Sequence, residues 1–285
     1  MFKRELDPKA INSLSNSRLF IEKLSPDIKK GEVFPAIRNG YIEFYYAGGC
    51  LFSFKNKFST NIKYASVFKK TGSGDYISED KLMHTDKINN FIEGYERIKE
   101  NCSHYAKEEA MGVSSIYSKY SYANNKATDI VVLDIEVSFK SLIPEKELNK
   151  DRIDLLIFNK DNKTLRFYEA KHYSNPEIWS RANTKPKVAK QIQKYNDQIK
   201  ENESDILHQY SHYIDITNSL FDLKLTKPNH INKDVVLLIF GFDRDQLKGR
   251  FSSLLKNDHS LDEINYYAIG DASDVIIKNM WQQLK

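Results

Sequence analysis

Residues 151–171 read DRIDLLIFNKDNKTLRFYEAK, and this stretch predicts two neighbouring β-strands joined by a short turn. Residues 152–158 form an apolar run that suits the first strand, and residues 164–171 suit the second. Between them, residues 159–163 read NKDNK, a polar segment rich in residues that favour turns. We therefore expect a β-hairpin.

Three charged residues interrupt these apolar strands. Asp154 lies inside the first run, while Glu169 and Lys171 share one face of the second strand and Ala170 takes the other, because side chains alternate along a strand. Two half-buried carboxylates repel unless a divalent cation neutralises them. A lysine beside that cation can hold or deprotonate a water, so the set predicts metal-dependent hydrolysis of a phosphodiester. The alternative is that Asp154 pairs with Arg152 or with a lysine at a strand end.

The composition is that of a globular protein, with 40% hydrophobic and 29% charged residues. The length of 285 residues suits one large domain or a core with a modest accessory domain. A net charge of only +4 excludes a polybasic nucleic-acid coat, although a local basic patch would still bind DNA.

Cysteine usage and the N-terminal residues indicate the compartment. Cys50 and Cys102 lie far apart and outside any CxxC or Cys/His cluster, which argues against a zinc site and a disulfide framework, with a single bridge as the alternative. Residues 1–17 lack the apolar run of a secretory signal, and no stretch of about 18 apolar residues exists. We expect a soluble, cytoplasmic protein without a membrane span.

The N-terminal part predicts an accessory region over residues 1–125, a small β-meander with helices. Its expected elements are a helix around 8–24, strands over 41–47, 50–54 and 61–67, and a helix over 87–109. The aromatic residues of the strands alternate with lysines, as in sheets that bind single strands. The alternative, which we prefer, is a small sheet with one face in the core.

Residues 126–285 predict one α/β (α+β) domain with a mixed central sheet flanked by helices. A strand over 129–139 precedes the hairpin, a long helix begins near 185–186, and 234–240 is an apolar run typical of a strand covered on both faces. A helix over 246–255, a strand over 264–269 and a helix over 272–284 follow.

The long helix has an apolar stripe and a polar shoulder. At about 100° per residue, the stripe consists of Val188, Ile192, Tyr195 and Ile199. The shoulder consists of Lys187, Gln191, Lys194 and Gln198. A helix that packs through the stripe would aim this shoulder at the charged hairpin residues, where its lysines would meet phosphate. The alternative is an ordinary amphipathic helix with a solvated edge.

Together these elements resemble the PD-(D/E)XK phosphodiesterase superfamily over about residues 129–240. That family has three strands, a helix and another strand in a restriction-endonuclease-like core, with its first acid in the second strand and E-x-K in the third. Asp154, Glu169 and Lys171 match these positions, and Gln191 with Tyr195 matches the Q-x-x-x-Y of the branch containing the RecBCD nuclease domain. Arg152 departs from the glycine that is frequent there.

The resemblance implies a nuclease that uses Mg²⁺, with Mn²⁺ as a substitute. Asp154, Glu169 and the Ala170 carbonyl would hold the metal ion, Lys171 would position or activate water, and Gln191 and Tyr195 would steady Lys171 or the scissile phosphate. The expected substrate is nucleic acid, most of all DNA, with endo- or exonucleolytic action left open.

The expected partner is DNA; a protein partner and a homodimer are both compatible with this reading. The main alternative is a catalytically silent nuclease-fold module that binds nucleic acid or a protein partner. A small-molecule or protein-interaction domain is the third reading, and the absence of a Gly-rich phosphate loop and of G-x-S-x-G weakens it.

Four further residues are candidates around the site. Glu136, in the strand before the hairpin, is either a third metal ligand or a solvent-facing acid. Trp179 and Arg181 either contact nucleic acid, by stacking on a base or holding a phosphate, or belong to a packed loop. His172 is expected to be a surface histidine. The family's preceding helix carries Glu or His, and the sequence does not choose among five glutamates: Glu93, Glu96, Glu100, Glu108 and Glu109.

Overall fold

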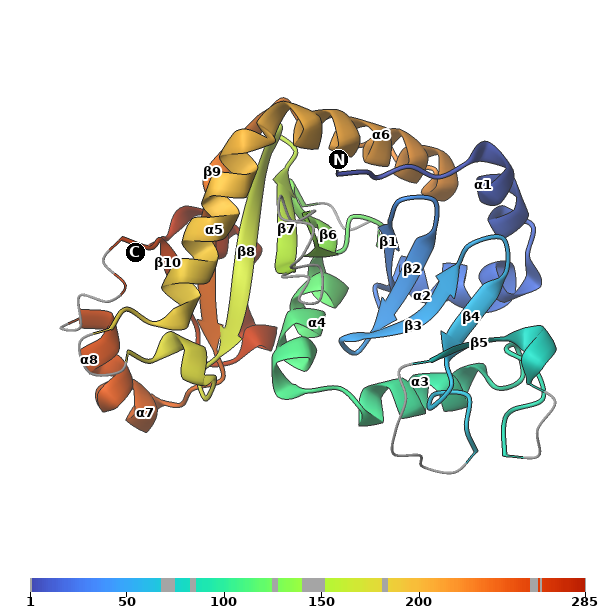
Figure 1. Cartoon of the computed structure of the whole chain (residues 1–285), viewed down its shortest axis with the longest axis horizontal. Coiled ribbons are helices and arrows are strands. Elements are labelled where there is room, and N and C mark those ends of the chain that lie inside the picture. Colours follow the sequence, from blue (N-terminus) through green and yellow to red (C-terminus); the bar gives the residue numbers. More distant parts are fainter. Residues whose placement is uncertain are drawn as a thin grey trace. The chain divides into compact units, whose positions relative to one another are not determined.

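The computed structural model describes residues 2–67, 75–82, 86–124, 128–139, 152–180, 184–256, 261 and 263–284. These residues form a mixed α+β structure with two five-stranded sheets (Figure 1). The chain divides into a C-terminal unit, Met1–Phe2, Thr128–Tyr210 and Thr226–Lys285, and an N-terminal unit, Lys3–Ala127 and Ser211–Leu225. The single boundary expected near residue 125 does not include this return of the chain. Across the described residues, no helix has the length and apolar character needed to cross a bilayer.

The N-terminal unit contains an antiparallel sheet in which the strands follow chain order. Its strands are β1 (Phe34–Ile37), β2 (Ile42–Tyr46), β3 (Gly49–Phe54), β4 (Phe58–Asn61) and β5 (Tyr76–Ser78). The expected strands over 41–47 and 50–54 are confirmed, but the strand expected over 61–67 is wrong. The Asn61 side chain accepts a hydrogen bond from Lys63 N, and Tyr64 N donates to Asn61 O, so the chain turns here.

Helices and buried side chains of the sheet build the core of this unit. The helical elements are α1 (Pro8–Ser15), η1 (Phe20–Leu24), α2 (Ser25–Lys30), η2 (Glu79–Lys81), α3 (Tyr95–His104) and α4 (Glu108–Tyr120). The single helix expected over 87–109 is wrong, because α3 begins only at Tyr95 and ends at His104, and Glu108 begins the separate helix α4. Phe44, Phe52 and Phe54 are buried, and so are Tyr45 and Leu51 beside them, so buried side chains lie on both faces of this sheet rather than on the single core face that we expected.

The C-terminal unit contains the mixed sheet, in the order β10-β9-β8-β7-β6. Its strands are β6 (Ile130–Val137), β7 (Ile153–Asn159), β8 (Thr164–His172), β9 (His230–Phe240) and β10 (Tyr266–Ala268). β6, β7 and β8 pair antiparallel, while β9 pairs parallel to β8 and β10 parallel to β9. The expected hairpin is therefore present as β7 and β8.

Helices connect and cover this sheet (Figure 1). They are η4 (Pro176–Ile178), α5 (Lys187–Glu201), α7 (Arg244–Lys248), α8 (Arg250–Lys256), η6 (Ala272–Asp274) and α9 (Ile277–Gln282). The helix α6 (Glu203–Phe221) begins in this unit, and its residues from Ser211 on belong to the N-terminal unit. The helix expected over 246–255 is interrupted at Gly249, and the one expected over 272–284 is reduced to η6 and α9. α5 follows β8 and packs against β9, so it is the crossover helix between two parallel strands.

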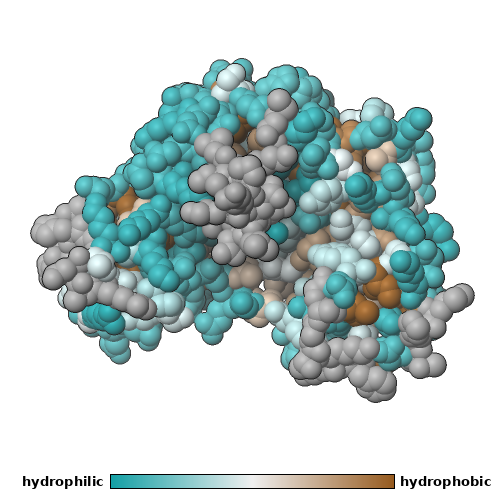
Figure 2. Space-filling model, viewed as in Figure 1, coloured by the Kyte–Doolittle hydropathy of each residue, from teal (hydrophilic) through white to brown (hydrophobic). Residues whose placement is uncertain are grey.

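The position of α5 depends on its apolar stripe. Val188, Ile192, Tyr195 and Ile199 are all buried, as the spacing predicts. Each such side chain contributes on the order of 1.5–3 kcal/mol when it is fully buried. The Asn196 side chain also accepts a hydrogen bond of 2.8 Å from Val235 N, which joins the helix to β9. The outward side of α5 is largely hydrophilic (Figure 2).

Candidate active site

The strand register brings the charged hairpin residues together. Leu155 lies opposite Tyr168 and Leu156 opposite Phe167. Extending this register by one residue places Asp154 opposite Glu169, and directly opposed residues of an antiparallel pair share a face. Lys171 follows Glu169 by two residues and therefore lies on the same face.

A hydrogen-bonded network connects this face to α5. Lys171 Nζ lies 2.7 Å from Glu169 Oε1, and both side chains are almost fully buried. Gln191 Nε2 donates to Glu169 Oε1 at 2.8 Å and to Tyr195 Oη at 2.9 Å. Tyr195 Oη in turn donates to the Arg152 carbonyl at 3.2 Å. Two side chains of β8, two of α5 and a backbone carbonyl just before β7 thus form one polar cluster.

Asp154 is the acid with the most strongly perturbed environment in this cluster. Burial raises its pKa well above the ordinary carboxyl value, and the negative charges of Glu169 and Glu136 raise it further. The hydrogen bond from Ala170 N to Asp154 Oδ2, 2.7 Å long, opposes that shift. A carboxylate held in this way is stabilised by any cation that approaches it.

Glu136 lies near this site in a strained conformation. Its φ angle is +50°, in the left-handed region, although it lies within β6. A non-glycine residue held there costs on the order of 1–3 kcal/mol. Its carboxylate lies 3.2 Å from Arg152 Nη1, and both side chains are partly exposed. Glu136 is therefore an ion-paired acid at the rim, close enough to affect the pKa of Asp154.

Glu177 is a neighbour of the site that the sequence does not indicate. It lies in η4, where the Asn175 side chain accepts a hydrogen bond from Glu177 N. Its Oε2 atom lies 3.4 Å from Lys171 Nζ, so the ammonium group lies between two carboxylates. No periodicity marks a residue in a loop of this kind, and only the course of the loop brings Glu177 to Lys171.

The remaining predicted residues have different surroundings. Lys187 and Lys194 are exposed on α5, and Arg181 lies outside the described residues. Trp179 is partly exposed, and its Nε1 donates to the Tyr173 carbonyl at 3.1 Å. His172 is partly exposed, and its Nδ1 lies 2.8 Å from Ser174 Oγ.

The donor set determines which metal ion would fit. Two carboxylates, Asp154 and Glu169, and the Ala170 carbonyl are hard oxygen ligands, and Mg²⁺ is commonly held by one or two carboxylates with water and phosphate oxygens. Among the described residues, no group of three His, Cys, Asp or Glu side chains is arranged to hold a metal ion. The two carboxylates and the carbonyl are oxygen donors of the kind that Mg²⁺ takes, and water and phosphate oxygens would have to supply its remaining ligands.

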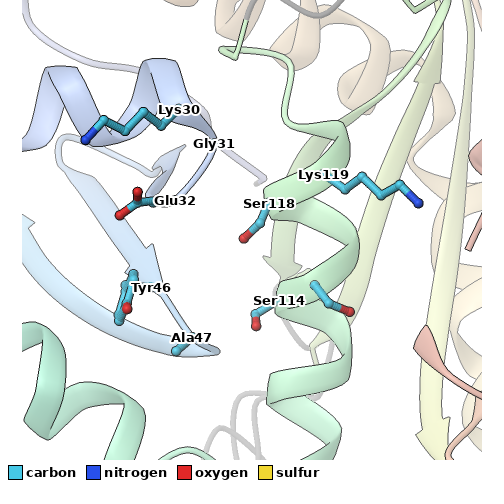
Figure 3. A pocket seen from close by; sticks show the side chains of 9 residues that line it. Lys30, Gly31, Glu32, Tyr46, Ala47, Ser114, Ser118 and Lys119 are labelled. Atoms are coloured by element: carbon cyan, nitrogen blue, oxygen red, sulfur yellow. The ribbon is translucent and has the colours of Figure 1, made fainter. Parts of the chain in front are cut away.

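The N-terminal unit contains a pocket of about 450 Å³. Lys30, Glu32, Tyr46, Ser114, Ser118 and Lys119 are among its lining residues. Ser114 and Ser118 face Glu32 and Tyr46 across it (Figure 3). None of the residues predicted for the hydrolytic site lines this pocket, so it does not bear on that chemistry.

Both cysteines, Cys50 and Cys102, are free thiols.

Comparison of the chain with protein-family models, curated proteins and solved structures found no match. The interpretation of the site therefore rests on the geometry of its own residues.

Proposed function

We propose that this protein is a Mg²⁺-dependent nuclease that hydrolyses phosphodiester bonds, most of all in DNA, through a PD-(D/E)XK-like site. The observation that carries the proposal is the hydrogen-bonded group of Glu169, Lys171, Gln191 and Tyr195. The register places Asp154 opposite Glu169 on the neighbouring strand, where Asp154 accepts a hydrogen bond from Ala170 N. An ion pair between Glu169 and Lys171 would not by itself require the hydrogen bonds that Gln191 and Tyr195 of α5 add to it.

The order of elements supports the same proposal. Three antiparallel strands, a crossover helix and a strand parallel to the third match the order expected of a restriction-endonuclease-like core. The acids are also on the expected strands, with Asp154 on β7 and Glu169 and Lys171 on β8.

In this proposal the metal ligands, Lys171 and Gln191 have separate roles. Asp154, Glu169 and the Ala170 carbonyl would hold the ion, which when bound polarises a phosphoryl oxygen and acidifies water. Lys171 places a positive charge beside the scissile phosphate and orients the attacking water. Gln191 holds the Glu169 carboxylate in position.

The second candidate is a nuclease-fold module that binds nucleic acid or a protein partner without cutting. The observation that favours it is the position of Lys171, whose ammonium already pairs with Glu169 and Glu177. A site balanced by its own lysine is stable without a metal ion, as in a structural ion-pair cluster.

Cleavage assays separate the two candidates. Plasmid and linear single- and double-stranded DNA are incubated with the protein in Mg²⁺, Mn²⁺ or EDTA, beside Lys171→Ala and the control Lys200→Ala, an exposed lysine of α5. The nuclease proposal expects metal-dependent cleavage, reduced at least about a hundredfold by Lys171→Ala and unchanged by the control. Full activity in Lys171→Ala would overturn the site assignment, and DNA binding without cleavage would favour the second candidate.

A further inference from the structure

A cluster of aromatic rings with one arginine lies in the segments that follow β8 and β9, and two of its members, Arg250 and Phe251, begin α8. We call it the stacking cluster; it consists of Tyr173, Trp179, Phe242, Arg250 and Phe251. The Arg250 guanidinium carbon lies 4.4 Å from the centre of the Trp179 ring. The ring centres of Trp179 and Tyr173 lie 5.4 Å apart in an edge-to-face arrangement, and those of Phe242 and Phe251 lie 4.5 Å apart.

The stacking cluster is adjacent to the candidate active site. Tyr173 follows Lys171 by two residues at the end of β8 and donates its backbone N–H to the Phe240 carbonyl. The short helix η4 then brings Glu177 to 3.4 Å from Lys171 Nζ, and Trp179 follows Glu177 by two residues. One loop therefore joins the charged site to the stacking cluster.

The cluster has a buried base and an accessible outer layer. Phe251 is fully buried and anchors the group. Tyr173, Trp179 and Phe242 are partly exposed, and Arg250 is exposed. Within the described part of the chain, no carboxylate forms a salt bridge with Arg250. The planar guanidinium of Arg250 thus stacks on the indole ring of Trp179 and is exposed to solvent.

A second tryptophan–arginine pair in the same unit shows what a structural stack looks like. The Arg166 guanidinium carbon lies 4.2 Å from the centre of the Trp281 ring, almost the same distance as in the Arg250 pair. Arg166 Nη1 also donates to the Trp281 carbonyl at 2.6 Å, and Trp281 is only 9% exposed. The two pairs differ in exposure and in hydrogen bonding rather than in stacking geometry.

We propose that the stacking cluster binds an unpaired base of single-stranded DNA next to the bond that is cut. An unpaired base stacks favourably on aromatic rings and on arginine guanidinium planes, and the positive charge attracts the neighbouring phosphates. A base inside a duplex already stacks on its neighbours, so the cluster would favour single strands or frayed ends. The placement beside the scissile bond rests on the proposed nuclease function; the binding of single strands does not.

Intrinsic fluorescence reports on Trp179 separately from catalysis. The chain has two tryptophans, so Trp281→Phe leaves Trp179 as the sole reporter, and Trp179→Phe leaves Trp281 as the matched control. Each variant is titrated in EDTA with a single-stranded oligonucleotide of about 12 nucleotides and with its blunt duplex. We expect quenching of Trp179 but not of Trp281, with the duplex binding about tenfold more weakly.

Arg250→Lys tests stacking against charge in the Trp281→Phe background, because lysine keeps the positive charge and loses the planar group. We expect about tenfold weaker single-strand binding with an unchanged salt dependence. The proposal is overturned if single strands leave Trp179 fluorescence unchanged, if the duplex binds equally well, or if Arg250→Lys binds like the parent.

The two proposals fail separately. Suppose that metal-dependent cleavage is lost in Lys171→Ala while Trp179 fluorescence does not respond to single strands. The nuclease proposal would then stand, and the stacking cluster would not be part of the substrate site. A Trp179 response without any cleavage would retain single-strand binding and remove the catalytic assignment.

Discussion

Gln191 Nε2 lies 2.8 Å from Glu169 Oε1, so an amide of α5 donates directly to the buried carboxylate of β8. The same nitrogen lies 2.9 Å from Tyr195 Oη, whose hydroxyl donates to the carbonyl of Arg152, the residue just before β7. Gln191 and Tyr195 together thus connect the crossover helix to β8 and to the start of β7. We expect the hydrogen bond from Gln191 to fix the orientation of the Glu169 carboxylate, which would otherwise be oriented by Lys171 alone.

Gln191→Glu tests that link. A carboxylate at position 191 would repel Glu169 instead of donating to it, so we expect DNA cleavage to fall at least about tenfold, equivalent to about 1.4 kcal/mol in the barrier. Gln193→Glu, the same change on the exposed side of α5, is the matched control and should cleave normally. Equal rates for both variants would exclude a positioning role for Gln191.

Glu136 allows strain and chemistry to be separated. Both Glu136→Gly and Glu136→Ala remove the carboxylate and its ion pair with Arg152. Only glycine adopts the φ of +50° without strain. We expect the glycine variant to be about 1 kcal/mol more stable than the alanine variant, measured by urea denaturation. If Glu136 also acts as a ligand, both variants should bind Mn²⁺ more weakly than the parent in calorimetry.

The raised pKa of Asp154 predicts a dependence of stability on pH in the metal-free protein. Because the folded state binds the proton more tightly than the unfolded chain, stability from this group is fully present below the ordinary carboxyl pKa of about 3.9. It is lost as the pH rises through the folded pKa. Asp154→Asn removes this loss while its side-chain oxygen still accepts from Ala170 N.

We therefore expect Asp154→Asn to be more stable than the parent at pH 7 in EDTA, with a difference that shrinks as the pH approaches 4. Each pKa unit of upward shift corresponds to about 1.4 kcal/mol. Urea denaturation at several pH values measures the difference. A pH-independent difference, or a less stable variant at pH 7, would contradict the assigned environment of Asp154.

Divalent metal ions should stabilise the folded protein through Glu169. A ligand at about a hundred times its dissociation constant raises the free energy of unfolding by about 2.7 kcal/mol. We expect Mn²⁺ to raise the melting temperature of the parent and to have little effect on Glu169→Gln, compared by calorimetry with EDTA controls. An equal rise of the melting temperature in both proteins would show that the metal ion binds at another site.

Cys102 should be unreactive in the folded protein. Burial raises the pKa of its thiol to about 12, although contacts with Tyr64 and Lys63 partly oppose the shift. A raised thiol pKa leaves little of the reactive thiolate at pH 8. We expect a thiol reagent to modify Cys102 in a Cys50→Ser variant at least a hundredfold more slowly before unfolding than in guanidinium, roughly in line with the difference in thiolate fraction. Similar rates would show that the site opens readily.

The sequence by itself determined the hairpin and the long helix. Alternation and turn residues predict β7 and β8 over 152–171, and the structure places them at Ile153–Asn159 and Thr164–His172. The spacing of Val188, Ile192, Tyr195 and Ile199 likewise predicts the buried face of α5. These signals are local, because side-chain direction repeats every two residues in a strand and every 3.6 residues in a helix.

Only the tertiary structure decided which residues meet across these elements. The contact of Glu177 with Lys171 depends on the course of a loop, and the left-handed conformation of Glu136 lies within a strand, where no sequence signal marks it. The membership of Ser211–Leu225 in the N-terminal unit follows from long-range packing. Contacts of this kind carry no period along the chain, because their energy arises between segments that the sequence keeps far apart.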